Sequence, residues 1–197
     1  SMRRRFEPFW ALPLIALAAL VTALFMSWRV NINLFSLHHF YRNRLMRCYL
    51  GATNHKRTPH ALTGFDEADD GPLDSLVAKA SGRVQRPMHI VGTAINLNRG
   101  RQLAWQSRRA ASFTFTPLHA GYAPASKQVK SGFRPVGQYG MDARDKPIML
   151  STAVAISGAA ASPNMGYHTS PAVAFLMSVF NVRLGHWCGD PAQAKAW

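Results

Sequence analysis

An uncharged apolar run near the N-terminus constrains the fold of this chain more than any other feature. The run reads FWALPLIALAALVTALFMSW and covers residues 9–28. A helix of that length rises ~30 Å, the thickness of the hydrocarbon core of a bilayer. Trp10 and Trp28 stand at its two ends, where indole rings favour the membrane–water interface. The run is longer than the apolar part of a typical signal peptide. The sequence therefore predicts a transmembrane helix over 9–28, preceded by a basic segment over 1–8.

The charge balance narrows the classes of partner. The formal net charge is +14, which favours an anionic partner, either nucleic acid or lipid headgroups. The basic residues are scattered along the chain, without zinc-finger spacing, a ribonucleoprotein signature or a glycine-rich phosphate loop. We therefore expect no nucleic-acid partner. Apolar residues make up 48% and charged residues 16%, a balance typical of a folded domain with a core.

The two cysteines, Cys48 and Cys188, form no CxxC pair, and free, buried thiols are expected. No spacing in the chain predicts a metal site or a cofactor site.

The segment after the apolar run has helical spacing. Apolar residues recur at intervals of three and four, at Leu34, Leu37, Phe40, Tyr41, Leu45 and Tyr49. Ser36 is placed to cap the start of this helix and Gly51 to end it. Three arginines on the helix are candidates for binding lipid phosphates, and a solvated basic face is the alternative; they are Arg42, Arg44 and Arg47.

Two histidines begin the same helix. Adjacent side chains on a helix point about 100° apart, so His38 and His39 are poorly placed to share a metal ion. A packing or interface role is expected for both. Residues 52–87 look loop-like, with an acidic cluster over 66–74 that lacks the alternation of a calcium-binding loop. A short helix capped by Asp74 is expected there.

The pattern then changes to strands. Residues 88–97, 102–106 and 111–122 have the composition of three strands, with a tight turn at 98–100 between the first two. In the third, Phe113 and Phe115 share one face. A polar loop over 123–147, a small-residue helix and an apolar helix starting at Pro171 follow. Strands interleaved with helices favour an α/β layered domain.

Ser157 is the one serine that invites a catalytic interpretation. It lies in VAISGAAAS, where a nucleophile would need a base within hydrogen-bond reach, a sharp turn and oxyanion donors. His168 could act as the base, but no feature of the sequence places it near Ser157. The alternative is a run of small residues that lets a helix pack closely against its neighbours. We expect this packing role, and no catalytic residue in the chain.

A second candidate headgroup site combines Trp105 with Arg108 and Arg109. The alternative is a tryptophan at the end of a strand beside solvated arginines, because exposed Trp–Arg contacts contribute little by themselves.

Several long motifs resemble a known family. PMHIVGTAINLNRGRQLAW resembles the strand-turn-strand of patatin-like phospholipases, and STAVAISGAAASPNMG resembles a later helix of that family. Large bacterial membrane-associated patatin-like proteins are the nearer likeness. They share FSLHHFYRNRLMRCYLGA, LAWQSRRAASFTFTP, AISGAAASPNMGYHTSPAVAFLM and NVRLGHW almost as written. The resemblance spans about residues 31–189.

The resemblance implies a lipid acyl hydrolase with a Ser–Asp dyad and no cofactor. The chain lacks that family's G-x-S-x-G elbow, and its one Asp-Gly step, Asp70-Gly71, continues into proline rather than the family's D-G-G or D-G-A. Residues 29–197 are therefore expected to be the central part of such a domain, inactive alone. The expected partners are membrane lipid and the rest of the hydrolase fold or a partner subunit. The alternative is a non-catalytic membrane protein that binds anionic lipid or a partner.

The family also implies a location in the bacterial inner membrane, with the soluble part in the cytoplasm. Basic residues flank both ends of the apolar run, so the positive-inside rule leaves the orientation open.

Overall fold

The chain divides into two units, residues 1–35 and residues 36–197. The computed structural model describes residues 10–78, 82–96, 110–123, 132–140 and 147–191. The predicted turn at 98–100 and the predicted strand at 102–106 lie outside the described residues.

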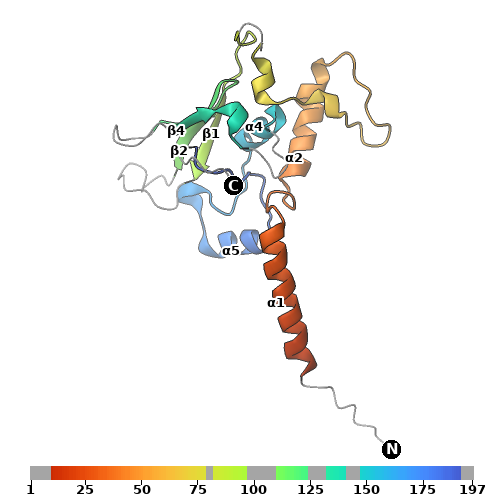
Figure 1. The fold of residues 1–197 in the computed structure, drawn as a ribbon, viewed down its shortest axis with the longest axis vertical. Coiled ribbons are helices and arrows are strands. Elements are labelled where there is room, and N and C mark those ends of the chain that lie inside the picture. Colours follow the sequence, from red (N-terminus) through yellow and green to blue (C-terminus); the bar gives the residue numbers. More distant parts are fainter. Residues whose placement is uncertain (1–9, 79–81, 97–109, 124–131, 141–146, 192–197) are drawn as a thin grey trace, which may run out of the picture. The chain divides into compact units, whose positions relative to one another are not determined.

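The first unit contains helix α1 (Ala11–Arg29), labelled in Figure 1. None of its residues is buried, its mean hydropathy is 2.1, and it is long and apolar enough to cross a membrane. Trp10 and Trp28 are 67% and 79% exposed at its ends, and the guanidinium carbon of Arg29 lies 5.9 Å from the Trp28 ring centroid. The predicted long apolar helix is confirmed, with its start shifted by two residues and its end by one.

The second unit begins with helix α2 (His38–Leu45), which continues as a π-helical turn and then a 3-10 turn. The predicted cap at Ser36 is wrong: Leu37 occupies that position and no side chain caps the helix. Gly51 is the C-cap of the π-helical turn, as predicted, and its backbone continues into the 3-10 turn. A Cβ at Gly51 would lie 2.5 Å from Oδ2 of Asp69, so a larger residue would displace that side chain.

The acidic cluster forms caps and one ion pair. Asp66 accepts a hydrogen bond from the amide of Ala68, and Arg57 lies 2.8 Å from Asp69. Hydrogen bonds from the amides of Ala68 and Thr58 hold the pKa of the Asp66 carboxyl below its usual range. The predicted cap at Asp74 is wrong, because the short 3-10 helix Leu73–Leu76 starts after Pro72 and contains Asp74.

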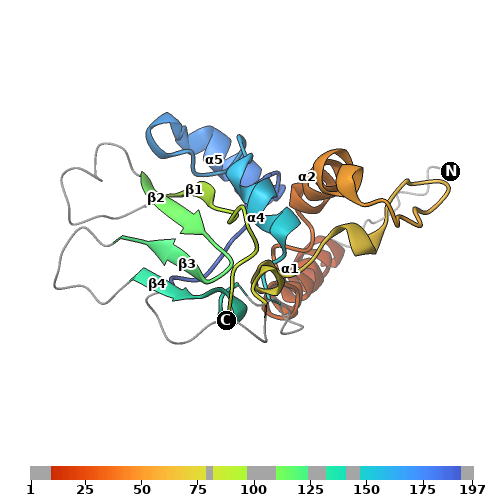
Figure 2. The ribbon, with the colours of Figure 1, turned by 90° about the horizontal axis from the view of Figure 1, so that it is seen from above.

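Four antiparallel strands form one sheet in the order β1-β2-β3-β4, visible in Figures 1 and 2. The strands are β1 (Val91–Asn96), β2 (Ala110–Phe115), β3 (His119–Tyr122) and β4 (Gly132–Pro135). The predicted single strand over 111–122 is wrong. Pro117 has no amide hydrogen and interrupts the strand, and the amide of Thr116 bonds to the carbonyl of His119 across a tight hairpin. The predicted loop over 123–147 contains β4.

The core lies where one face of this sheet meets helix α4 (Leu150–Ser157). Phe113 and Phe115 are both buried, as their alternation predicts. Helix α4 packs against β1, and α2 packs against α4 (Figure 2). The described residues thus form a mixed α/β fold with an antiparallel sheet.

Helix α5 (Pro171–Val179) starts with proline at its first turn, as predicted. None of its residues is buried, and Phe175, Leu176 and Val179 are 67%, 54% and 60% exposed.

Candidate functional site

A pocket of about 350 Å³ opens at the sheet in the second unit. This volume falls within the range of small-molecule sites, ~300–1,000 Å³. Strands β1, β2 and β3 of the sheet line it, together with Tyr139, the end of α4 with the residues after it, and the segment 183–190. The pocket therefore combines groups that lie far apart in the sequence.

The floor of the pocket is aromatic. The ring centroids of Phe113 and Phe115 are 4.9 Å apart, and Tyr139 lies 5.8 Å from Phe113 and 6.2 Å from Phe115. All three side chains are at most 4% exposed. The floor can bind apolar atoms of a ligand through dispersion and burial of their surface.

Segment 183–190 forms one wall and is held at three points. The hydroxyl of Tyr139 donates to the carbonyl of Gly189 at 2.9 Å. The amide of Leu184 donates to the carbonyl of Ala161 at 2.9 Å, and the carbonyl of Leu184 accepts from Nδ1 of His38 at 2.7 Å. These bonds fix the loop by its backbone and leave its side chains to define the pocket wall.

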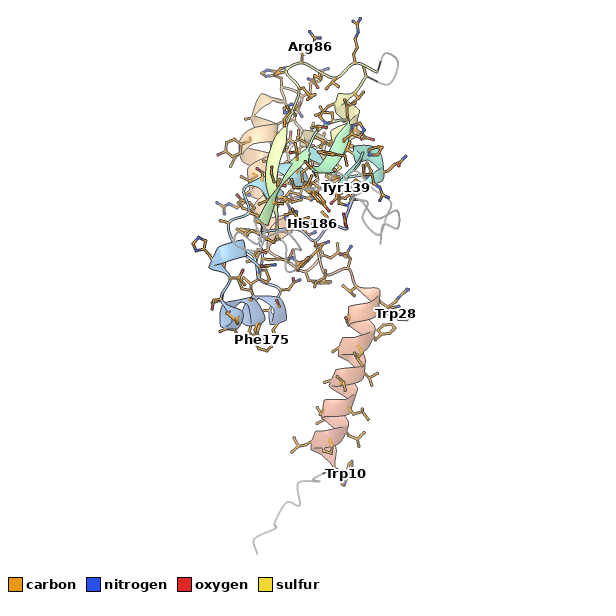
Figure 3. The ribbon with its side chains drawn as sticks, turned by 90° about the vertical axis from the view of Figure 1, so that its left-hand side faces the viewer. Trp10, Trp28, Arg86, Tyr139, Phe175 and His186 are labelled. Carbon is orange, nitrogen blue, oxygen red and sulfur yellow. The ribbon has the colours of Figure 1, made fainter. Side chains whose placement is uncertain are left out.

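Two histidines lie together at this wall: His186 is part of it, and His38 lies behind it. The ring centroids of His38, on α2, and His186 are 4.9 Å apart. His186 and Tyr139, both labelled in Figure 3, line the pocket. Because a carbonyl only accepts, the bond to Leu184 places the hydrogen of His38 on Nδ1.

Both imidazoles are held in the neutral form. Burial, followed by smaller effects of nearby basic groups, lowers the pKa of His38 from 6.5 to about 4 and that of His186 to about 3. Arg42 and Arg183 are among these basic groups, and burial lowers the pKa of Arg183 to about 10. Arg183 is 3% exposed and its guanidinium carbon lies 5.7 Å from the Trp187 ring centroid.

The pocket is lined by both basic and acidic groups. The carboxylate of Asp190 is 3.5 Å from the hydroxyl of Tyr122. Burial first, and then the negative charge of Asp190, raises the pKa of Tyr122, and the pKa of Tyr139 is raised by burial with a smaller contribution from Asp190. Asp190 is not among the groups that shift the pKa of either histidine. The groups that act on the histidines are therefore basic, and the group beside Tyr122 is acidic.

Ser157 does not line this pocket. Its hydroxyl donates to the carbonyl of Gly92 at 2.7 Å and joins the end of α4 to β1. Next to it, the hydroxyl of Tyr41 donates to the carbonyl of Gly158 at 2.9 Å, and a Cβ at Gly158 would lie 2.5 Å from that hydroxyl. The small residues here thus allow α2, α4 and β1 to approach closely.

A different serine contacts an aspartate. The hydroxyl of Ser151 donates to Oδ2 of Asp70, whose Oδ1 accepts the amide of Ser151 at 3.0 Å. Ser151 is fully buried at the start of α4, so this contact anchors the helix N-terminus and is closed to substrate.

The three arginines predicted to bind lipid phosphates have different contacts in the structure. Arg42 helps to lower the pKa values of both histidines through its charge. Arg44 packs its guanidinium carbon 5.5 Å from the Phe40 ring centroid, and Arg47 donates to the carbonyl of Thr63 at 2.6 Å. They do not form one common cluster. Trp105, Arg108 and Arg109 lie outside the described residues.

The cysteines are both free, as expected, but Cys188 is only half-buried. Burial raises the pKa of the Cys188 thiol to about 12, so this pocket residue is unreactive near neutral pH. Cys48 is exposed, which corrects the sequence-based expectation, because it lies on the outer side of the π-helical turn.

Sequence reasoning did not single out Tyr139, Arg183, His186 or Asp190 as site residues. The dense mixture of polar and aromatic residues in NVRLGHWCGD was the available signal. Among the described residues, no group of three or more His, Cys, Asp or Glu side chains is placed to hold a metal ion. Comparison with protein-family models, curated proteins and solved structures gave no match.

Proposed function

We propose that this chain is a membrane-anchored segment of a patatin-like lipid acyl hydrolase. It would supply part of the sheet, a wall of the lipid cleft and a contact with the bilayer. The complete enzyme would cleave acyl esters of phospholipid with a Ser–Asp dyad and without a metal or organic cofactor. The observation that carries the membrane part is α1, a helix of 19 residues with mean hydropathy 2.1 and no buried residue.

The lipid part of the proposal is supported by two further features. The pocket has an aromatic floor and a polar wall, which suits an amphipathic ligand. Helix α5 is too short to span a bilayer, yet it exposes large apolar side chains, among them Phe175, labelled in Figure 3. Such a helix can insert into the boundary between headgroups and acyl chains. The hydrolase part is supported by the family resemblance of residues 31–189.

An esterase assay tests the assignment of activity. The purified chain in lipid nanodiscs should not hydrolyse a fluorogenic short-acyl ester above background, because the hydroxyl of Ser157 is engaged by the carbonyl of Gly92. Turnover that Ser157→Ala abolishes would overturn the packing role of this residue. The coding sequence on both sides provides the independent test: adjoining G-x-S-x-G and D-G-G regions support the hydrolase, and unrelated regions contradict it.

Membrane contact is tested by fractionation. Arginines placed at Leu17 and Leu20, near the centre of α1, should release the chain from membranes at alkaline pH, because each costs about 3 kcal/mol at mid-bilayer. The matched control, Leu62→Arg, changes an exposed loop residue and should stay membrane-bound. Equal release of both variants would contradict anchoring by α1.

A non-catalytic protein that binds anionic lipid is the second candidate. The basic groups around the histidines favour it, because they offer positive charge to an anion. A protein with this function should still bind lipid if the adjoining coding regions lack the G-x-S-x-G and D-G-G motifs.

A further inference from the structure

The region of the two histidines, His38 and His186, contains polar atoms that the fold leaves without partners. Nε2 of His38, Nδ1 of His186 and Nε of Arg42 are all buried and have no hydrogen-bond partner among the described residues. Buried polar groups in folded proteins are nearly always paired with protein, water or ligand. Three such atoms around one pair of rings therefore indicate that a polar species binds there.

The charges identify the kind of species. The charged and titratable groups that shift the pKa of either histidine are all basic: His39 and Arg42 on α2, Arg183 on the wall and, for His186, also His38. Helix α4, which packs on α2, carries no titratable side chain. A metal cation would be repelled by the two guanidinium groups, whereas an oxyanion would be attracted and could accept their N–H donors.

Access comes from the pocket. Arg183 and His186 line it, and His38 lies directly behind His186. The carboxylate of Asp190 lies beside the hydroxyl of Tyr122 and repels an anion from that part of the pocket. Arg134 on β4 acts weakly on Tyr139 but is not among the lining residues.

We propose that Arg183, His186, His38 and Arg42 form a binding site for a phosphate-class oxyanion. The phosphate belongs either to a lipid headgroup or to a small soluble phosphate ester. The site is independent of the proposed hydrolase function, because it rests on groups within residues 36–197 and on no catalytic step.

Binding at this site should be linked to a proton. Nδ1 of His38 is committed to the carbonyl of Leu184, so Nε2 can donate to a phosphate oxygen only after it takes up a proton. A phosphodiester keeps one negative charge between pH 5 and pH 8. Uptake of one proton makes its binding up to about tenfold tighter for each pH unit lowered.

The experiment uses the full chain in maltoside micelles, with ¹³C-labelled histidine rings observed by NMR in phosphate-free buffer. Dimethyl phosphate is titrated at pH 5.5, 6.5 and 7.5, and binding should shift the rings of His38 and His186 and strengthen as the pH falls. Arg183→Gln should weaken binding at least tenfold. The control, Arg86→Gln, removes an exposed arginine far from His186 in Figure 3 and should bind within twofold of the native chain.

One further variant and two further ligands keep the result decisive. If Arg183→Gln does not fold, His38→Gln replaces it and should flatten the pH dependence of binding, because Nε2 of His38 takes up the linked proton. Glycerophosphocholine and phosphatidylcholine vesicles test the source: tighter binding than dimethyl phosphate assigns a lipid headgroup, and equal or weaker binding assigns a soluble phosphate ester. Absence of binding to every probe, or equal binding by Arg183→Gln and the native chain, overturns the proposal.

Discussion

The buried histidine on α2 makes the stability of the fold depend on pH. His38 is fully buried, and its pKa in the fold is about 4 against 6.5 in its ordinary state. Each pKa unit corresponds to about 1.4 kcal/mol, so this difference amounts to ~3 kcal/mol. Below pH 6.5 the unfolded chain binds a proton at His38, whereas the folded chain binds it only as the pH approaches 4. Stability is therefore full above pH 6.5 and falls as the pH drops toward 4.

The test compares the native chain with His38→Gln by urea unfolding at pH 7.5 and pH 4.5 in maltoside micelles and a buffer free of oxyanions. Glutamine keeps a donor for the carbonyl of Leu184 but does not titrate. The native chain should lose about 2–3 kcal/mol more than the variant between the two pH values. His186, whose pKa is lowered in the same direction, remains in both chains, as do the carboxylates, so their effects largely cancel. An equal pH dependence of the two chains would refute the neutral, buried state of His38.

Three other changes test the packing and the thiols. Gly158→Ala places a methyl group against the hydroxyl of Tyr41 and should lower the free energy of unfolding by about 1 kcal/mol, and Tyr41→Phe should remove most of that difference in a double-mutant cycle. Phe115→Ala deletes a ring that is 2% exposed and should cost about 3–5 kcal/mol, measured by the same urea titration; a cost below 1 kcal/mol would contradict its place in the core. At pH 8, Ellman's reagent should modify Cys48 at once and Cys188 only after denaturation, and rapid reaction of two thiols in the folded chain would contradict the raised pKa of Cys188.

Local patterns in the sequence were enough for the elements whose cause is local. Helix α1 follows from an unbroken apolar run, and α5 from Pro171 and the apolar residues after it. Phe113 and Phe115 lie on one buried face because side chains alternate along any strand. The division of residues 111–122 into two strands also has a local cause, the missing amide hydrogen of Pro117. The prediction missed it because the alternating pattern continues on both sides of that proline.

Other features depend on contacts that no local pattern reports. Gly51 is a helix cap, as its residue type predicts, but its close approach to Asp69, 18 positions later in the chain, could not be predicted. Strand β4 is four residues long and ends in proline, so it forms only because β3 offers it a partner. The resemblance to patatin-like proteins predicted neither feature. Membership of that family is a proposal that the motifs support.

The candidate site shows the same division between local and distant causes. The sequence marked His38 as a structural residue because adjacent histidines diverge on a helix, and burial of His38 agrees with that geometry. It did not bring His186 beside it, because that depends on the bond from His38 to the carbonyl of Leu184 and on the anchoring of Gly189 by Tyr139. Arg42 and Arg183, which look like scattered surface charge in the sequence, act together on the two histidines in the fold. The net charge of the chain therefore does not reveal where its basic groups gather, because that depends on which of them the fold partly removes from water.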